Sequence, residues 1–359
     1  MPGHPRIVAR GSAENPAGRF ERLRLSEAPD FVDDDPGAAE AGEPRPLATR
    51  YYRDPSRTLL STNRSPDLGF DTSLNPYRGC ENGCVYCFAR PTHEFLGLSA
   101  GLDFESHILV KEDAPELLEA ALRKPGWKPR TVALGAVTDP YQPVERRLRI
   151  TRRCLQVFAR YRNPLGIVTK SGMVTRDLDV LRELASDDCA VVNVSITSLD
   201  DSLRRVMEPR ASSPRERLRA VEALARAGVP VGVMVAPIVP GLTDHEIPAL
   251  VAAAADAGAQ RVGRIVLRLP HGVADLFEAW LERHFPERRQ KVMNRVRALR
   301  GGRRNDPRFG TRLRGEGVYA DSIEALFEQA RRRAGLSDAP ISLSAEHFRR
   351  PGGDQLTLL

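Results

Sequence analysis

Three cysteines within eight positions are the residues of this sequence with the clearest chemical potential. Cys80, Cys84 and Cys87 lie in the segment NPYRGCENGCVYCFARPTHEFLG, where they are spaced C-x-x-x-C-x-x-C. Three thiolates from one short loop can bind three irons of a cubane iron–sulfur cluster. The fourth iron then has no protein ligand and can bind a small molecule, which is typical of catalytic metal sites. Gly79 and Gly83 would let the loop curl tightly.

A zinc site is the alternative interpretation of the same segment. His93 lies six residues after Cys87 and could complete a tetrahedron of three cysteines and one histidine. Structural zinc sites usually combine paired C-x-x-C motifs from two elements, unlike this single asymmetric triplet. The other two cysteines, Cys154 and Cys189, lie in apolar runs and are expected to be small core residues. Two ligands cannot hold a second cluster of the kind that needs four cysteines, so none is expected.

Apolar segments alternate with helical patterns along the middle of the chain, and these elements must position the cysteine loop. The segments TVALGAV, LGIVTKS and CAVVNVSITS are nearly continuous apolar runs, typical of parallel strands covered on both faces. Strands followed by helices at this spacing predict right-handed βαβ units. About six strands are expected, two fewer than in a complete eight-stranded barrel. The sequence therefore predicts an α/β fold with a partial (β/α)6 TIM-like barrel; a doubly wound open sheet is the alternative.

Three regions are expected along the chain. Residues 1–48 are rich in Pro, Gly, Ala and acids and are predicted to be largely disordered, although the piece RGSAENPAGRFER could dock on the main body. Residues 49–272 would form the barrel core, with the cluster loop at 79–90. Residues 273–359 are expected to be a mostly helical, basic extension that ends in a disordered tail.

Charge is concentrated in the C-terminal part of a chain whose net charge is +7. The segment Arg283–Arg314 contains twelve Lys or Arg and two acids, so it could attract the phosphates of a nucleic acid. A solvated basic surface is the simpler alternative.

No apolar stretch approaches the roughly 18 residues of a membrane span, and MPGHPRIVARGS shows no secretory signal, so we expect a cytoplasmic location and no membrane partner.

The cysteine motif also carries a family resemblance. C-x-x-x-C-x-x-C with an aromatic residue, Tyr86, before the last cysteine resembles the signature of the radical SAM superfamily. NPYRGC, TDPYQPVE, SITSLDDSLRRVMEPR and APIVPGLTD resemble an uncharacterised bacterial branch that is related to spore photoproduct lyase and called DNA-repair-photolyase-like. The resemblance runs from about residue 50 to 335. It implies a [4Fe–4S] cluster on Cys80, Cys84 and Cys87, S-adenosylmethionine (SAM) on the fourth iron, and reductive cleavage to a 5′-deoxyadenosyl radical. It also implies an electron donor such as flavodoxin or ferredoxin.

The resemblance further implies which residues contact the SAM cofactor. Tyr86 would lie against its adenine, unless it is only a packing aromatic. Thr138 and Asp139, at the end of the second strand, would hold its amino group, unless TDP is an ordinary turn. Lys170, at the end of the third strand, would meet its carboxylate or a substrate phosphate.

Further cofactor contacts are implied in the fourth strand, at Ser195, and beyond it, at Glu208 and Arg210. Ser195 would reach the ribose hydroxyls. Glu208 and Arg210, in MEPR, resemble a ribose or carboxylate clamp; a loop salt bridge is the alternative.

One position departs from the resembled family. Spore photoproduct lyases carry a hydrogen-donating cysteine where this chain has Ala136, so direct repair of the spore thymine dimer is not expected. Tyr141 is a nearby hydrogen donor to consider. Three hypotheses follow: a radical SAM enzyme on an unidentified substrate, with nucleic acid as one candidate; a non-catalytic iron–sulfur or zinc module that binds nucleic acid; or a radical SAM enzyme on a small molecule or protein.

Overall fold

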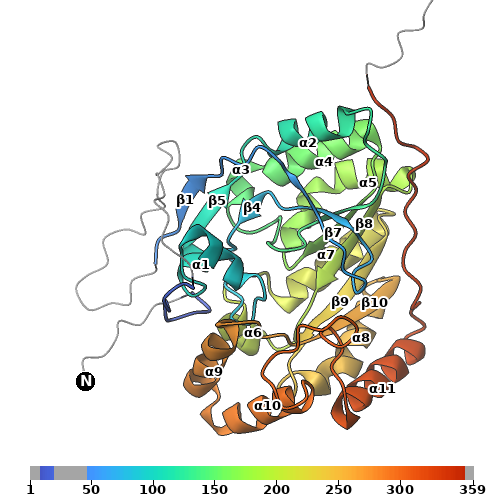
Figure 1. The fold of residues 1–359 in the computed structure, drawn as a ribbon. Coiled ribbons are helices and arrows are strands. Elements are labelled where there is room, and N and C mark those ends of the chain that lie inside the picture. The colour runs from blue at the N-terminus through green and yellow to red at the C-terminus, as the bar shows by residue number, and fades with distance from the viewer. Residues whose placement is uncertain (1–8, 20–46, 352–359) are drawn as a thin grey trace, which may run out of the picture.

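A seven-stranded sheet forms the centre of the computed structural model, which describes residues 9–19 and 47–351 (Figure 1). The strand order is β10-β9-β8-β7-β6-β3-β2. The strands are β2 (Leu60–Thr62), β3 (Thr72–Leu74), β6 (Val132–Leu134), β7 (Leu165–Thr169), β8 (Ala190–Ser195), β9 (Val231–Ile238) and β10 (Arg261–Val266). All neighbours are parallel except β2, which runs antiparallel to β3. The six parallel strands follow chain order without reversal, so the predicted partial barrel is confirmed and the doubly wound alternative is wrong.

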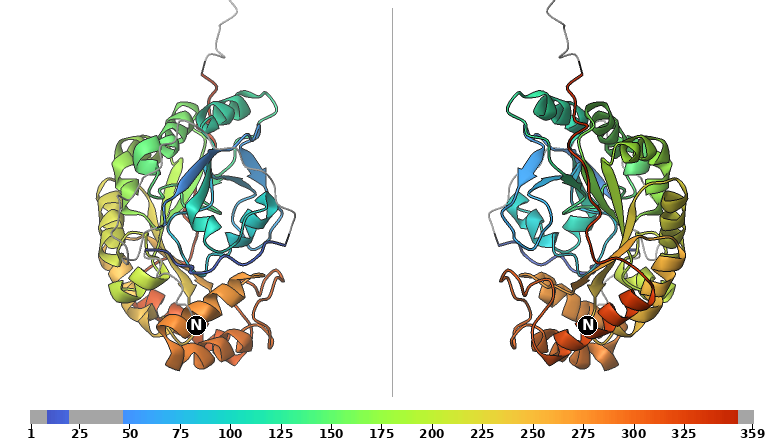
Figure 2. Two further views of the ribbon diagram at one scale, coloured as in Figure 1. Left: turned by 90° about the vertical axis from the view of Figure 1, so that its left-hand side faces the viewer. Right: turned by 90° about the vertical axis from the view of Figure 1, so that its right-hand side faces the viewer.

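Helices cover the outer face of this sheet, and Figure 2 shows them as a crescent on one side of the molecule. They include α2 (Ala114–Arg123), α4 (Ile150–Tyr161), α5 (Leu178–Ser186), α7 (Pro214–Arg226) and α8 (Ile247–Asp256). In α4, the buried residues Cys154, Leu155 and Phe158 recur with helical spacing on one apolar face. The main hydrophobic core contains these side chains and also Cys189, so both isolated cysteines are core residues, as predicted.

A second, smaller sheet carries the base of the cysteine loop. It consists of β1 (Arg50–Arg53), β5 (His107–Val110) and β4 (Tyr77–Arg78), in the order β1-β5-β4. The loop follows β4, and η1 (Arg90–Leu96) and α1 (Asp103–Ser106) come after it. The sequence did not indicate this sheet, because its strands have only two to four residues.

The described segments nearest to each end of the sequence contact the barrel. Residues 9–19, from the region predicted to be disordered, pack against the cysteine loop and α1 (Figure 1); residues 1–8 and 20–46 lie outside the described residues. The remaining elements are α3 (Glu145–Leu148), η2 (Gly172–Asp177), α6 (Asp201–Met207), η3 (Asp244–Glu246), α9 (Val273–His284), α10 (Pro286–Ala298) and α11 (Val318–Arg333). The chain then runs back along the helical layer, where Arg349 N donates to Tyr161 O at 2.9 Å. The rest of the predicted tail, 352–359, is outside the described residues.

The segment 306–313 joins the two edges of the large sheet. Val266 N in β10 donates to Leu313 O at 2.9 Å. Gly310 N donates to Asp67, in the loop between β2 and β3, at 2.7 Å. The C-terminal extension therefore lies across the side of the barrel that its six parallel strands leave open. Among the described helices, none is long and apolar enough to cross a membrane.

Candidate functional site

The cysteine loop is tightly curled, as its two glycines predicted. Gly79 has φ +80° and Gly83 has φ +67°, a region that disfavours side chains. Space is also restricted, because a Cβ on Gly79 would come within 2.9 Å of the His93 ring. Backbone hydrogen bonds fix the loop at both ends: Cys80 N donates to Phe104 O at 2.9 Å, and Val85 N donates to Met207 O at 3.1 Å.

The three thiols of this loop are neighbours within a mostly apolar environment. Cys80 and Cys84 are buried, Cys87 is half-buried, and all are free of disulfides. Burial is the main cause that raises the pKa of each thiol, and for Cys80 nearby Asp139 and the other two cysteines add to the effect. A bound metal would displace these thiol protons. In a cubane cluster each cysteine binds its own iron, so three separate thiols from one loop fit three of its corners.

The zinc alternative fits less well. In residues 9–19 and 47–351, no three His, Cys, Asp or Glu side chains are grouped to surround one metal ion. His93 is buried, its Nε2 lies 2.8 Å from His107 O, and its ring packs edge-on against Phe104. Burial lowers the pKa of His93 from 6.5 to about 4, so it is a neutral core histidine.

A buried ion pair of Arg90 with Glu105 supports the cysteine loop. Arg90 and Glu105 are both fully buried and in contact, and Arg90 also donates to the carbonyl oxygen of Cys84 at 3.0 Å. Glu105 accepts further hydrogen bonds from Gly11 N and Ser12 N, each at 2.9 Å. Since a buried charge is costly unless its hydrogen-bonding capacity is filled, the N-terminal segment completes the support of the cysteine loop.

A second network lies beside Cys84 and is centred on Glu208. This carboxylate is 1% exposed and accepts hydrogen bonds from Tyr86, Arg217 and Thr197, the last at 2.6 Å. Burial alone would raise the pKa of Glu208. The opposing effects of the Arg217 and Lys170 cations and of the hydrogen bonds are larger, so the pKa lies well below its usual value. Glu208 is therefore ionised at neutral pH.

Lys170 joins the same network from the end of β7. Its Nζ lies 3.3 Å from Glu208 and donates to Ser195 Oγ at 2.8 Å and to Ala236 O at 3.0 Å. It also lies 5.7 Å from the centre of the Tyr86 ring. The structure thus brings together Tyr86, Lys170, Ser195 and Glu208, four of the residues predicted to contact the cofactor. Lys170 and Ser195 meet because the carboxyl ends of the parallel strands β7 and β8 share one edge, whereas Tyr86 comes from the cysteine loop and Glu208 from the end of α6.

Arg210 is not part of this network. Its guanidinium lies 3.0 Å from Glu81 and donates to Thr49 at 3.1 Å. Glu81 is fully buried in the cysteine loop and also accepts a hydrogen bond from Val144 N at 2.8 Å. The two side chains thus leave the MEPR segment toward different partners, which does not favour a clamp formed by Glu208 and Arg210 as a pair.

Thr138 and Asp139 mainly hold loops in place. Thr138 is buried and donates to Tyr77 O at 2.9 Å. The Asp139 carboxylate accepts from Asn82 at 2.9 Å, from Lys170 N at 2.7 Å and from the Thr169 hydroxyl at 2.7 Å. These bonds tie the cysteine loop to the end of β7. Contact of either residue with the cofactor stays a prediction.

Tyr141 lies apart from the Glu208 network. It is 1% exposed, belongs to the main core, and donates to Asp177 at 3.1 Å. Burial, followed by the charge of Asp177, raises the pKa of Tyr141 well above its usual value. This packed position does not favour its proposed role as a hydrogen donor. Ala136 follows β6 in a half-buried bend, and Cys154 is buried in the core.

Arg217 was missed by the sequence reasoning, although its position carried a signal. It lies in α7 with the buried Ala220, Val221 and Leu224, at spacings of three, four and seven residues. An arginine in the apolar stripe of a helix needs a buried partner, which here is Glu208.

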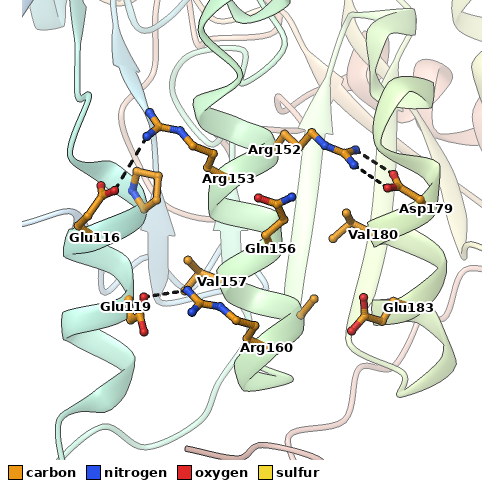
Figure 3. A pocket seen from close by; sticks show the side chains of 12 residues that line it. Glu116, Glu119, Arg152, Arg153, Gln156, Val157, Arg160, Asp179, Val180 and Glu183 are labelled. Atoms are coloured by element: carbon orange, nitrogen blue, oxygen red, sulfur yellow. Dashed lines mark hydrogen bonds and ion pairs between the residues drawn. The ribbon is translucent and has the colours of Figure 1, made fainter. Parts of the chain in front are cut away.

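A hollow between α2, α4 and α5 lies on the outer helical face (Figure 3). Its charged side chains point toward one another across the groove. Arg152 pairs with Asp179 at 2.6 Å and Arg160 with Glu119 at 2.7 Å. None of the cysteines lines it, and each of its three arginines is paired with a carboxylate, so we do not assign it a catalytic role.

The basic segment Arg283–Arg314 has fewer unpaired charges than its composition suggests. Arg289 pairs with Glu278 at 2.9 Å. Arg300 is buried and donates to Leu267 O at 2.7 Å. Charge in this segment therefore serves partly to hold the extension together, and does not by itself define a nucleic-acid surface.

Comparison with known proteins assigns the fold and the cysteine loop to a family. Residues 74–254 match the radical SAM superfamily, and the chain belongs to that superfamily. Its members use an iron–sulfur cluster to cleave SAM for radical chemistry.

Most of the relatives that the sequence matches are uncharacterised; one, a radical SAM Nalpha-GlyT isomerase of Pseudomonas phage M6, is 22% identical over 200 residues, 55% of this chain and 39% of that protein. Protein Rv2578c of Mycobacterium tuberculosis strain H37Rv is 38% identical over 234 residues, which is 65% of this chain and 68% of that protein. Protein MJ0683 of Methanocaldococcus jannaschii is 30% identical over 173 residues, 48% of this chain and 62% of that protein.

Among solved structures, the chain resembles spore photoproduct lyase complexed with dinucleoside spore photoproduct. The TM-score is 0.57 at 17% sequence identity, over 79% of this chain and 78% of the other. This similarity concerns the fold.

Proposed function

We propose that this chain is a radical SAM enzyme that binds a [4Fe–4S] cluster through Cys80, Cys84 and Cys87 and abstracts a hydrogen atom from its substrate. The supporting observation is the polar Glu208 network directly beside Cys84, at the carboxyl ends of the strands. When bound, the cluster supplies the electron that cleaves SAM to methionine and a 5′-deoxyadenosyl radical. The protein has to bind SAM, orient it and exclude water.

We assign the SAM contacts to the residues of this network. Lys170 is the cation for the cofactor carboxylate, since its side chain is 15% exposed and points toward the cysteine loop residue Tyr86. Ser195 and Glu208 are the acceptors for ribose hydroxyls. Arg217 is a positioning residue, because it is buried behind Glu208 and keeps that carboxylate ionised. The adenine contact of Tyr86 stays a prediction.

The donor that returns a hydrogen atom to the product cannot be the cysteine that a spore photoproduct lyase uses. Alanine occupies position 136, and the isolated cysteines Cys154 and Cys189 are buried in the core. Dimer repair is therefore not proposed. Nucleic acid is the candidate substrate class, as a relative with the same fold is seen with a dinucleoside. An electron donor such as flavodoxin or ferredoxin and a cytoplasmic location complete the proposal.

Anaerobic reconstitution with iron and sulfide, followed by dithionite and SAM, tests this function. We expect a brown protein that forms 5′-deoxyadenosine. Cys84→Ala should form none above background, whereas Cys189→Ala, a matched change in the core, should retain activity. A colourless protein with one zinc ion, or equal 5′-deoxyadenosine from Cys84→Ala and the wild type, would overturn the proposal. Zinc with nucleic-acid binding would favour the non-catalytic module instead.

A further inference from the structure

Two of the exposed phenylalanines in the described part of the chain are each paired with an arginine. Phe88 is 47% exposed and Phe309 is 58% exposed. Each has an arginine guanidinium over its ring: Arg268 lies 5.6 Å from the centre of Phe88, and Arg312 lies 4.6 Å from the centre of Phe309. An exposed aromatic face next to a cation is the usual means of stacking and holding a nucleobase.

The two pairs belong to one patch at the cysteine end of the barrel. Phe88 directly follows Cys87, and Arg268 lies two residues beyond the end of β10. Leu267 and Leu269, on either side of Arg268, pack in the same core as Cys84 and Tyr86. We call the surface formed by Phe88, Arg268, Phe309 and Arg312 the mouth platform.

Arg268 and Arg312 link the two halves of the mouth platform. Arg300 donates to Leu267 O at 2.7 Å and to Thr311 O at 3.0 Å, so it holds the backbone next to Arg268 beside the backbone next to Arg312. In agreement with this, the charge of Arg312 adds to burial in lowering the pKa of Arg268. Arg312 is fixed by Asp67 at 2.6 Å, and the same carboxylate accepts from Gly310 N. Asp67 is therefore already engaged by other donors.

Arg268 lacks an acceptor of its own within residues 9–19 and 47–351. It is half-buried, yet it makes no hydrogen bond or ion pair with any described residue, and its buried Nε has no partner. Buried donors in proteins are almost always satisfied, so the Nε of Arg268 calls for an acceptor that is not among the described residues. A phosphate is the matching group, because it accepts in the planar fork geometry of arginine.

We propose that the mouth platform binds a segment of single-stranded nucleic acid, with a phosphate on Arg268 and unstacked bases on Phe88 and Phe309. Two aromatic faces fit successive bases, and stacking on them requires bases that are not paired in a duplex. This inference rests on the proposed function, since the position of Phe88 next to Cys87 would bring the bound nucleotide beside the radical source.

Fluorescence anisotropy of a labelled oligothymidylate of twelve nucleotides, titrated with the reconstituted protein, tests whether the mouth platform binds single-stranded nucleic acid. Phe88→Ala and Arg268→Ala should each weaken binding about tenfold. Arg268→Ala should also reduce the salt dependence of binding by about one phosphate contact. Matched controls are Phe95→Ala, at an exposed phenylalanine in η1, and Arg303→Ala, at an exposed arginine of the basic segment. Both should bind within about twofold of wild type.

The platform proposal would be overturned if the wild type did not bind the oligonucleotide, or if the control variants lost as much affinity as Phe88→Ala and Arg268→Ala. It would also be overturned if polyglutamate displaced the labelled oligonucleotide as effectively as unlabelled oligonucleotide does. Duplex DNA that binds as tightly as the single strand would also contradict it. The 5′-deoxyadenosine assay on wild-type protein is run in parallel. Normal 5′-deoxyadenosine without oligonucleotide binding rejects the platform alone, whereas binding without 5′-deoxyadenosine rejects the proposed enzyme function alone.

Discussion

Gly11→Ala is the sharpest test of how the N-terminal segment supports the cysteine loop. A Cβ at this position would lie 1.7 Å from Gly83 O and 2.9 Å from Gly83 C, both in the backbone between Cys80 and Cys84. Ordinary contact begins near 3.4 Å, so the two backbones must separate substantially or the segment must detach. A backbone cannot rotate away from such a clash as a flexible side chain can.

The size of the effect follows from Glu105. Detachment removes the hydrogen bonds from Gly11 N and Ser12 N to this fully buried carboxylate. Hydrogen bonds to a charged group contribute about 1.5–3 kcal/mol each, so docking of the segment should weaken by about 3–6 kcal/mol. Arg90 would then be the main remaining partner of Glu105, and the loop that presents Cys84 would open more often.

Iron release to a chelator from anaerobically reconstituted protein measures this opening. Gly11→Ala should release iron at least about tenfold faster than wild type, because 1.4 kcal/mol already corresponds to a factor of ten. Gly18→Ala is the matched control in the same segment, since its Cβ would meet only Leu98 O at 3.4 Å. Equal release from the two variants would refute the supporting role of residues 9–19.

Three further predictions concern single side chains. Glu208→Gln should raise the KM for SAM at least about tenfold, because a charge-assisted contact is lost; an unchanged KM would remove Glu208 from the cofactor site. Arg210→Ala should leave that KM unchanged and reduce stability in urea by about 1 kcal/mol, since its partner is Glu81 and it is 28% exposed. His93 has a folded-state pKa below its ordinary 6.5, so its contribution to stability is full above pH 6.5. That contribution falls as the pH drops toward 4, by up to about 1.4 kcal/mol per pH unit. His93→Gln should flatten this dependence in urea unfolding, and an unaltered slope would contradict the assignment.

The sequence predicted those parts of the site that local rules determine. Gly79 and Gly83 were identifiable from the turn that three clustered cysteines need, and both have positive φ. The family resemblance implied Lys170 and Ser195 at strand ends and Glu208 in the segment beyond one, and parallel strands bring such ends together.

Pairings between distant parts of the chain were not predictable in this way. Glu105 accepts from Gly11, which lies 94 residues earlier in the piece RGSAENPAGRFER; the sequence suggested that this piece could dock, but not onto which residue. Arg210 lies only two residues after Glu208 in the sequence, but its side chain forms an ion pair with Glu81. Choices of this kind depend on which partner is buried nearby, and sequence spacing does not contain that information.

Deuterium transfer is the most direct test of hydrogen abstraction from nucleic acid. Wild-type protein with cluster, reductant and SAM is incubated with single-stranded DNA deuterated on its sugars and bases, and the 5′-deoxyadenosine is analysed by mass spectrometry. We expect that 5′-deoxyadenosine gains deuterium, and that Phe88→Ala and Arg268→Ala reduce this labelling. 5′-Deoxyadenosine that forms but stays unlabelled while the DNA is bound would contradict hydrogen abstraction from nucleic acid.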